Sequence, residues 1–192
     1  MKIGIYGGSF NPIHFGHIGL AKWVVEHTDL DELWLMVSPN NPLKDKSILA
    51  DEQERLREAR EAIEHPTNPR GLSGTPLRRE GDEAMRRVIV SDFEFHLPRP
   101  NYTAYTLREL KKLYPEHDFT LIIGEDNLEI FSKWREYQYI LDNYRIFVYP
   151  RHNAAGSEAM RRLGEKARRI IFLTGAPYFD ISSTYLRKNL RS

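Results

Sequence analysis

A short segment near the start of the chain, from Ile3 to His17, constrains the fold more than any other. It combines an apolar alternating run (Ile3, Ile5), two glycines followed by a proline, and two histidines three residues apart. The run is typical of a buried β-strand, and glycines let backbone N–H groups approach an anion closely. Apolar residues at helical spacing follow, so the positive end of a helix would face the glycines. This order of strand, glycine turn and helix predicts a phosphate-binding site.

The two histidines indicate which kind of phosphate site this is. His14 and His17 would lie on one face at the start of the helix, and Gly16 between them leaves room for a ligand. An imidazole can donate a hydrogen bond when neutral and carry charge when protonated, which suits a phosphoryl oxygen that gains charge during displacement. The segment has neither the P-loop signature nor the G-x-G-x-x-G of dinucleotide folds. We therefore expect a different way of holding phosphate.

Length and composition narrow the class of protein. The chain has 192 residues, a formal net charge of +1 and no cysteine. We expect a single domain over 1–192, with no nucleic-acid or membrane partner, because no net field would attract either. The lack of cysteine excludes disulfides and thiolate catalysis and is compatible with a cytoplasmic location. No signal peptide or membrane span is expected. The oligomeric state is left open, with a homo-oligomer among the options.

Apolar runs of strand length alternate with helical patterns along the chain. Strands are expected at 33–37, 88–90, 119–123, 145–149 and 170–173. Helices are expected from the histidines to about 27, over 51–64 with Asp51 and Glu54 as a capping pair, after Thr103 as an N-cap, and over 158–163. Continuous apolar runs are typical of parallel sheets. We predict a Rossmann-like α/β fold with a mainly parallel sheet, helices on both faces, and a site along the carboxyl ends of the strands. Residues 65–87, rich in proline, glycine and arginine, are expected to form a surface insertion.

Several polar residues follow expected strands and are candidate ligands on that ground alone. Lys44 lies in a loop after a strand, where it could reach a triphosphate or simply be solvated. An acidic residue directly after a strand, Glu125 or Asp126, could accept hydrogen bonds from ribose hydroxyls. Arg151 could meet a phosphate or be merely exposed. Ser182 and its neighbours would open a final helix whose N–H groups hold phosphate, although an ordinary serine cap is the alternative.

Two motifs make the chain resemble a known family. The run Gly7-Gly8-Ser9-Phe10-Asn11-Pro12-Ile13-His14-Phe15-Gly16-His17 resembles the H-x-G-H signature of the nucleotidyltransferase superfamily, and Ile181-Ser182-Ser183-Thr184-Tyr185-Leu186-Arg187 resembles its second signature, I-S-S-T-x-[IL]-R. The doubled glycine and the first histidine are similar to those of bacterial nicotinate-mononucleotide adenylyltransferases. The resemblance covers nearly the whole chain and implies the Rossmann-like nucleotidyltransferase fold.

The resemblance assigns roles to individual residues. It implies that His14, His17 and Arg187 act on the phosphates during transfer. It implies ATP-binding roles for Gly7, Gly8, Ser9, Phe10, Gly16, Asp126, Ser182 and Ser183, and substrate-binding roles for Asn40, Lys44, Tyr102, Thr103, Thr106 and Trp134. Arg151, from its position after a strand, is a further candidate for binding the substrate phosphate. In this family an aromatic at the position of Trp134 stacks on the pyridine ring, and Asp126 is favoured over Glu125 by the G-x-D-x-L pattern.

The implied reaction is transfer of the adenylyl group of ATP, with Mg²⁺ on the triphosphate, to nicotinate mononucleotide. No resident metal ion is expected in the protein. Three alternatives remain at this stage: an adenylyltransferase with another acceptor, a metal-dependent hydrolase using the histidines, and a nucleotide sensor without turnover. Two histidines are few for a catalytic zinc site, which usually has three protein ligands, and both signatures are intact, which argues against the sensor.

Overall fold

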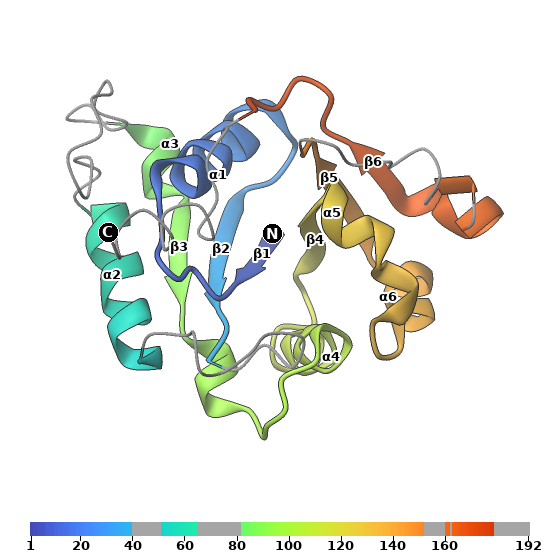
Figure 1. Cartoon of the computed structure of the whole chain (residues 1–192), viewed down its shortest axis with the longest axis horizontal. Helices are drawn as coiled ribbons and strands as arrows, with labels where there is room; N and C mark the ends of the chain where they lie inside the picture. Colours follow the sequence, from blue (N-terminus) through green and yellow to red (C-terminus); the bar gives the residue numbers. More distant parts are fainter. Residues whose placement is uncertain (40–50, 65–81, 152–159, 162, 179–192) are drawn as a thin grey trace, which may run out of the picture.

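The computed structural model describes residues 1–39, 51–64, 82–151, 160–161 and 163–178. Within these residues, six strands form one sheet in the order β3-β2-β1-β4-β5-β6, and every neighbouring pair is parallel (Figure 1). The strands are β1 (Lys2–Gly8), β2 (Glu32–Val37), β3 (Val88–Ser91), β4 (Asp118–Gly124), β5 (Arg145–Tyr149) and β6 (Ile170–Phe172). The predicted fold class, a Rossmann-like parallel sheet, is confirmed.

Helices cover both faces of the sheet. The helices are α1 (Phe15–His27), α2 (Glu52–Glu64), α3 (Glu83–Arg86), α4 (Thr103–Leu113), α5 (Glu125–Glu129) and α6 (Tyr137–Asn143), with short 3-10 turns η2 (Phe93–His96), η3 (Phe131–Lys133) and η4 (Gly164–Arg169). Two cores result because strand side chains alternate between the faces. On β1, Tyr6 packs with α1, α2 and α3, whereas Ile3 and Ile5 pack with α4 and α6.

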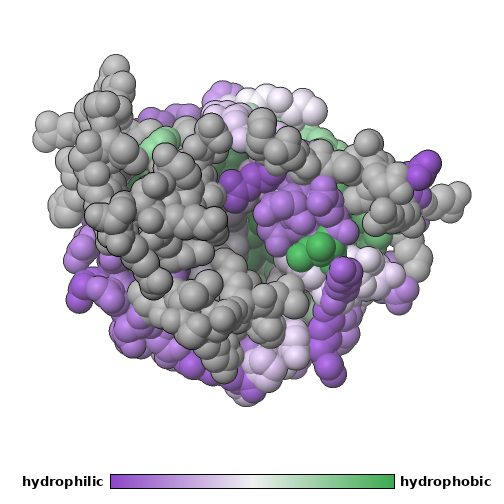
Figure 2. All heavy atoms as spheres, in the orientation of Figure 1, coloured by the Kyte–Doolittle hydropathy of each residue, from purple (hydrophilic) through white to green (hydrophobic). Residues whose placement is uncertain are grey.

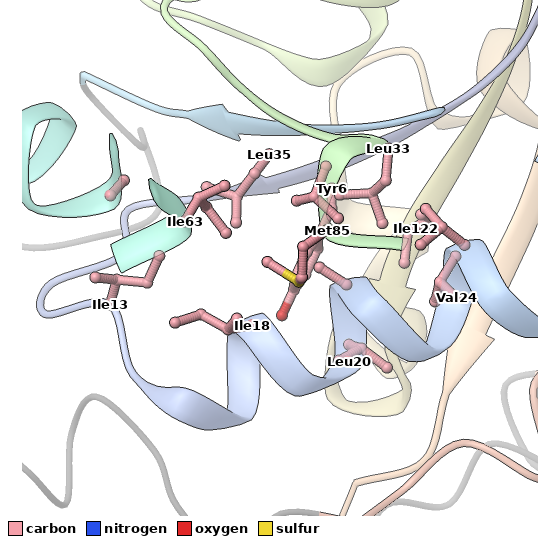
Figure 3. Close-up of a cluster of buried hydrophobic side chains, with 14 of the residues drawn as sticks. Tyr6, Ile13, Ile18, Leu20, Val24, Leu33, Leu35, Ile63, Met85 and Ile122 are labelled. Atoms are coloured by element: carbon pink, nitrogen blue, oxygen red, sulfur yellow. The ribbon is translucent and has the colours of Figure 1, made fainter. Parts of the chain in front are cut away.

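The end of the expected surface insertion is in fact packed into the first core. Residues 65–81 lie outside the described part, but Ala84 and Met85 on α3 are buried. Figure 3 shows Met85 between α1 and the sheet, near Ile18 and Leu33. Lys22 on α1 pairs with Asp82, which also caps α3, at a distance of 2.5 Å. The α3 helix therefore packs against the core through Ala84 and Met85, while the side chains of Glu83 and Arg86 are exposed.

Most local expectations agree with the structure, with three differences. Asp51 caps α2 as expected, since its carboxylate accepts from the N–H groups of Gln53 and Glu54. Thr103 is not the cap of α4: Tyr102 has the extended backbone of an N-cap, and Thr103 is already the first helical residue. The last strand ends one residue earlier than expected, at Phe172. Of the helix expected over 158–163, residues 160, 161 and 163 are helical and the others lie outside the described part.

The third difference concerns the two glycines. They were expected in a turn, but β1 continues through Gly7 and Gly8, which pair with Met36 and Val37 of β2. The turn lies further on, at Asn11 and Pro12. Because all the strands are parallel, their carboxyl ends meet along one edge of the sheet, and the segments that follow β1, β2, β4 and β5 gather there.

Candidate active site

The segment between β1 and α1 is held by packing. Phe10 adopts a left-handed backbone (φ 44°) although it is not glycine, and its ring is buried. A Cβ added at Gly8 would lie 2.9 Å from that ring, so only glycine fits beside it, whereas a Cβ at Gly7 would project into open space. Gly7 thus leaves backbone accessible, and Gly8 lets the Phe10 ring pack against the strand end. Ser9 is buried, and its hydroxyl has no hydrogen-bond partner among the described residues.

The two histidines stack against each other at the start of α1. Their ring centroids are 3.6 Å apart, with 26° between the planes. His14 is the N-cap, and its backbone N–H donates to Nδ1 of His17 at 3.2 Å. A ring nitrogen that accepts carries no proton, so the neutral His17 ring carries its proton on Nε2. The expected placement of His14 and His17 on one face at the start of the helix is present.

Burial determines the charge of His14. Its side chain is only 5% exposed, and neither ring nitrogen has a partner among the described residues. Burial, helped by the positive charge of Arg151, lowers the pKa of His14 from 6.5 to about 4. The ring is therefore neutral at pH 7, where one of its nitrogens can donate a hydrogen bond to an incoming oxygen and the other can accept one.

The histidines face a recess at the carboxyl edge of the sheet, which we call the phosphate recess. It is lined by Tyr6, His14, Gly16, His17, Leu20, Tyr149, Pro150, Arg151 and Pro177. The hydroxyls of Tyr6 and Tyr149 lie 3.5 Å apart, and burial raises the pKa of both phenols, so both keep their protons. The recess is thus lined by neutral donors and one cation.

That cation, Arg151, is held by the segment after β4. Its backbone N–H donates to the carboxylate of Glu125 at 3.2 Å, and its Nε lies 3.7 Å from Oδ1 of Asp126. Gly124 makes this approach possible, because a Cβ there would lie 2.3 Å from the same Asp126 oxygen. Asp126 and Arg151, expected to bind different parts of the ligands, are therefore brought together beside the histidines.

A second group of expected ligands lies at the other side of the edge, around the start of α4. The guanidinium of Arg135 lies 5.3 Å from the centre of the Tyr102 ring, which places Tyr102 beside the segment that carries Trp134. The Trp134 ring packs against Phe131 at a centroid distance of 5.2 Å, and its indole N–H is buried without a partner among the described residues. Thr103 is partly exposed at the first turn.

Thr106 differs from these residues because its hydroxyl is used inside the protein. It donates to Oε1 of Glu94 at 2.8 Å and lies 3.3 Å from the backbone carbonyl of Tyr102. A hydroxyl has one proton to donate, so Thr106 supports the start of α4 rather than offering that proton to a ligand.

Five of the expected site residues lie outside the described part of the chain: Asn40, Lys44, Ser182, Ser183 and Arg187. Within the described part, no group of three or more histidine, cysteine, aspartate or glutamate side chains is arranged to hold a metal ion. Nor does that part contain a helix both long and apolar enough to span a membrane.

Sequence reasoning missed four residues of this region. The strand pattern accounts for Tyr6 and Tyr149 without indicating a role in a site, although the hydroxyl of a buried tyrosine usually has a polar partner. No motif in the sequence singles out Arg55 or Glu94. A signal existed for Arg55, because it lies four residues before Ala59 on the apolar side of α2, where a charged residue is unusual.

Taken together, the parallel sheet, the glycine strand end and the stacked histidines define a nucleotide-binding α/β protein of the nucleotidyltransferase class. A model of the cytidylyltransferase-like family matches residues 5–189. A protein of Flavobacterium johnsoniae is 42% identical over 191 residues, covering 100% of this chain and 87% of its own, and one of Bacteroides thetaiotaomicron is 43% identical over 190 residues, covering 99% and 82%. Both are named probable nicotinate-nucleotide adenylyltransferases. This chain belongs to the nicotinate-nucleotide adenylyltransferase family.

The fold is also that of solved structures. A Plasmodium falciparum nicotinic acid mononucleotide adenylyltransferase, complexed with NaAD, superposes with a TM-score of 0.76 at 20% identity, covering 97% of this chain and 82% of its own. At that identity the likeness concerns the fold alone.

Proposed function

We propose that this protein transfers the adenylyl group of ATP to nicotinate mononucleotide, forming nicotinate adenine dinucleotide and pyrophosphate. The observation that carries the proposal is the stacked pair of His14 and His17 at the start of α1, facing the recess with Arg151. Helix N-terminal N–H groups, imidazole donors and a guanidinium all stabilise phosphate oxygens. Family membership supports the choice of ATP and of a pyridine mononucleotide as substrates.

The reaction is an in-line displacement at the α-phosphorus of ATP. An oxygen of the nicotinate mononucleotide phosphate forms a bond to that phosphorus, and the bond to the bridging oxygen of the β-phosphate breaks, so pyrophosphate leaves with the electron pair. The attacking oxygen is already anionic, so no general base is needed. Catalysis then depends on orientation and on stabilising the charge of the phosphoryl oxygens.

Three residues that line the phosphate recess, His14, His17 and Arg151, have roles in this scheme. His17 would donate from Nε2 to an α-phosphate oxygen, and neutral His14 would do the same from one of its ring nitrogens. Arg151 would attract the phosphates of either substrate. Beyond the described part, Ser182, Ser183 and Arg187 would hold the departing pyrophosphate, and Asn40 and Lys44 would contact the acceptor.

Mg²⁺ would enter as part of MgATP. The residues present fit this, because the Asp126 carboxylate beside the recess lies 3.7 Å from Nε of Arg151, and no group of three or more metal-binding side chains occurs among the described residues. Mg²⁺ in nucleotide sites takes most of its ligands from phosphate oxygens and water, and it supplies charge neutralisation on the triphosphate. We place the reaction in the cytoplasm, a prediction that the lack of cysteine supports.

The acceptor pocket would lie between Trp134 and the start of α4. An indole face suits an electron-poor pyridine ring, and the N–H groups of the first turn of α4, beside Tyr102 and Thr103, would receive the nicotinate carboxylate. Selectivity for the acid over the amide would then come from this helix N-terminus.

Pyrophosphate release from MgATP tests the proposal directly. Nicotinate mononucleotide, nicotinamide mononucleotide and phosphopantetheine are offered separately, and strong preference for the first is expected. Turnover with only another acceptor would keep the histidine chemistry and refute the substrate. Silence with all three acceptors would favour a nucleotide sensor.

A single substitution tests the role of the histidine. His17→Ala should lower kcat by about 100-fold or more, the usual loss for one transition-state donor, while ATP binding measured by calorimetry changes far less. An equal loss of ATP affinity and of kcat would contradict a transition-state role.

A further inference from the structure

A buried arginine joins the segments that follow β1 and β2. Arg55, on α2, is 1% exposed. Its Nη1 donates to the backbone carbonyls of Ser9 at 2.5 Å and Ser38 at 2.9 Å, and its Nη2 donates to the carbonyl of Pro39 at 3.0 Å. Ser9 belongs to the segment that leads into the phosphate recess. Ser38 and Pro39 begin the segment after β2. One guanidinium thus determines how far apart these two segments lie.

Ser38 extends the hydrogen bonds of Arg55 to two further segments of the chain. Its backbone N–H donates to the carbonyl of Gly8 at 2.9 Å, its carbonyl accepts from Arg55, and its hydroxyl donates to Oε2 of Glu94 at 2.6 Å. Three of its polar groups are therefore bonded, and each to a different segment of the chain. Ser38 cannot shift without breaking bonds to β1, to α2 and to η2.

Glu94 carries the connection on to α4. Its side chain is 6% exposed, and its two carboxylate oxygens accept separately, Oε2 from Ser38 and Oε1 from Thr106. Its backbone carbonyl also accepts from the side-chain amide of Asn101 at 3.0 Å, just before α4. The hydroxyl of Thr106 in turn lies 3.3 Å from the carbonyl of Tyr102. A continuous line of hydrogen bonds thus runs from Ser9 to the start of α4.

Two buried charges are an unusual way to build such a connection. Buried ions cost free energy to desolvate, and apolar residues of similar size often stabilise a fold as well or better. The rest of the buried side of α2 is apolar, with Leu56, Ala59, Ala62 and Ile63. What a guanidinium provides, and an apolar side chain does not, is a rigid planar group that reaches several carbonyls in set directions. The contacts of Arg55 use that property.

We propose that Arg55 and Glu94, joined through Ser38, are positioning residues that hold the ATP-binding segment at a set separation from the acceptor pocket. We call Arg55, Ser38 and Glu94 the buried frame. This inference rests on the proposed function, because it assigns Ser9 and its neighbours to ATP and the start of α4 to the acceptor. In-line displacement requires the two reacting groups to be aligned, and a misplacement of about 1 Å costs on the order of 100-fold in rate.

The kinetic experiment compares Arg55→Met, Glu94→Gln and the milder Ser38→Ala with the wild-type protein. The frame predicts that kcat per folded molecule falls by about 100-fold in Arg55→Met and by about 10-fold in Ser38→Ala, while KM for ATP and for nicotinate mononucleotide each change less than about threefold. Arg57→Met is the matched control, because Arg57 lies on the same helix with its side chain 65% exposed. The control should keep wild-type kcat.

A merely structural role predicts a different result. The folded fraction of each variant is measured by circular dichroism at the assay temperature. If the loss of activity follows the folded fraction alone, or if Arg55→Met keeps wild-type kcat, the frame is refuted and the proposed function stands. If the wild-type protein itself gives no product, the proposed function fails and a measurement without substrate decides the frame.

That measurement is amide hydrogen exchange in the free protein. Arg55→Met should speed exchange about tenfold or more in peptides covering 5–13 and 33–39, and Glu94→Gln should do so in peptides covering 33–39 and 101–107, while β5 stays as protected as in the wild type. Arg57→Met should change none of these. Unchanged exchange in the peptides covering 33–39 of both variants would overturn the frame, whatever the enzyme assay shows.

Discussion

The pKa of His14 makes the stability of the free protein depend on pH in a calculable way. The unfolded chain takes up a proton on this histidine near pH 6.5, whereas the folded protein does so only near pH 4. Between these values the unfolded state binds more protons, so protonation favours unfolding and stability falls as the pH falls. Above about pH 6.5 the contribution of neutral His14 is fully present, and it is lost progressively down to about pH 4.

The magnitude follows from the two pKa values. A pKa difference of 1 corresponds to about 1.4 kcal/mol of unfolding free energy. The full lowering of the His14 pKa, from 6.5 to about 4, therefore corresponds to roughly 3 kcal/mol. Between pH 8 and pH 5 the loss amounts to about 2 kcal/mol. That is a large part of the 5–15 kcal/mol by which typical domains are stable, and it can be measured by urea denaturation at each pH.

The comparison is between the wild-type protein and His14→Gln, which keeps a polar side chain but does not titrate in this range. Other titrating groups act in both proteins, so the difference between their unfolding free energies isolates His14. Between pH 8 and pH 5, the free energy of unfolding of the wild type should fall by about 2 kcal/mol more than that of His14→Gln. A difference that stays constant across this range, or an NMR titration midpoint of His14 near 6.5, would refute the reasoning.

Three further substitutions test the site and the fold around it. Met85→Ala should lower the free energy of unfolding by about 3 kcal/mol, because it leaves a cavity between α1 and the sheet; a loss below about 1 kcal/mol in urea denaturation would mean that α3 is not part of the core. Gly124→Ala should raise KM for ATP about tenfold, the effect of losing one charge-assisted hydrogen bond, because the new Cβ would displace the Asp126 carboxylate; unchanged steady-state KM would exclude Asp126 as an ATP ligand. Trp134→Ala should raise KM for nicotinate mononucleotide about tenfold and leave KM for ATP unchanged, since only the pyridine ring would stack there; a rise in both constants would contradict a stacking role.

The described surface around the site is mostly polar. In the view of Figure 2 the described residues are largely hydrophilic, with a small hydrophobic patch. The exposed large apolar residues among those described, which include Ile89, Leu113 and Ile171, lie on different elements. Scattered apolar residues are normal for a protein surface.

Local sequence patterns were sufficient for the elements of the fold. Continuous apolar runs predicted the parallel strands, because both faces of a parallel sheet are buried, and the Asp51 cap and the helix after the histidines followed from short-range rules. The spacing of His14 and His17 likewise placed both rings on one face. These rules failed at two boundaries. Pairing with β2 extends β1 through Gly7 and Gly8, and the extended backbone of Tyr102 makes that residue, and not Thr103, the N-cap of α4.

The sequence by itself determined the class of the fold, the motif at the start of α1 and the resemblance to adenylyltransferases, since each depends on residues close together along the chain. Only the tertiary structure decided that Asp126 faces Arg151, that His14 is neutral, and that Arg55 and Glu94 meet at Ser38. These contacts join residues up to 56 positions apart, as between Ser38 and Glu94. Burial and the directions of donors set them, and neither can be read from a residue's neighbours in the sequence.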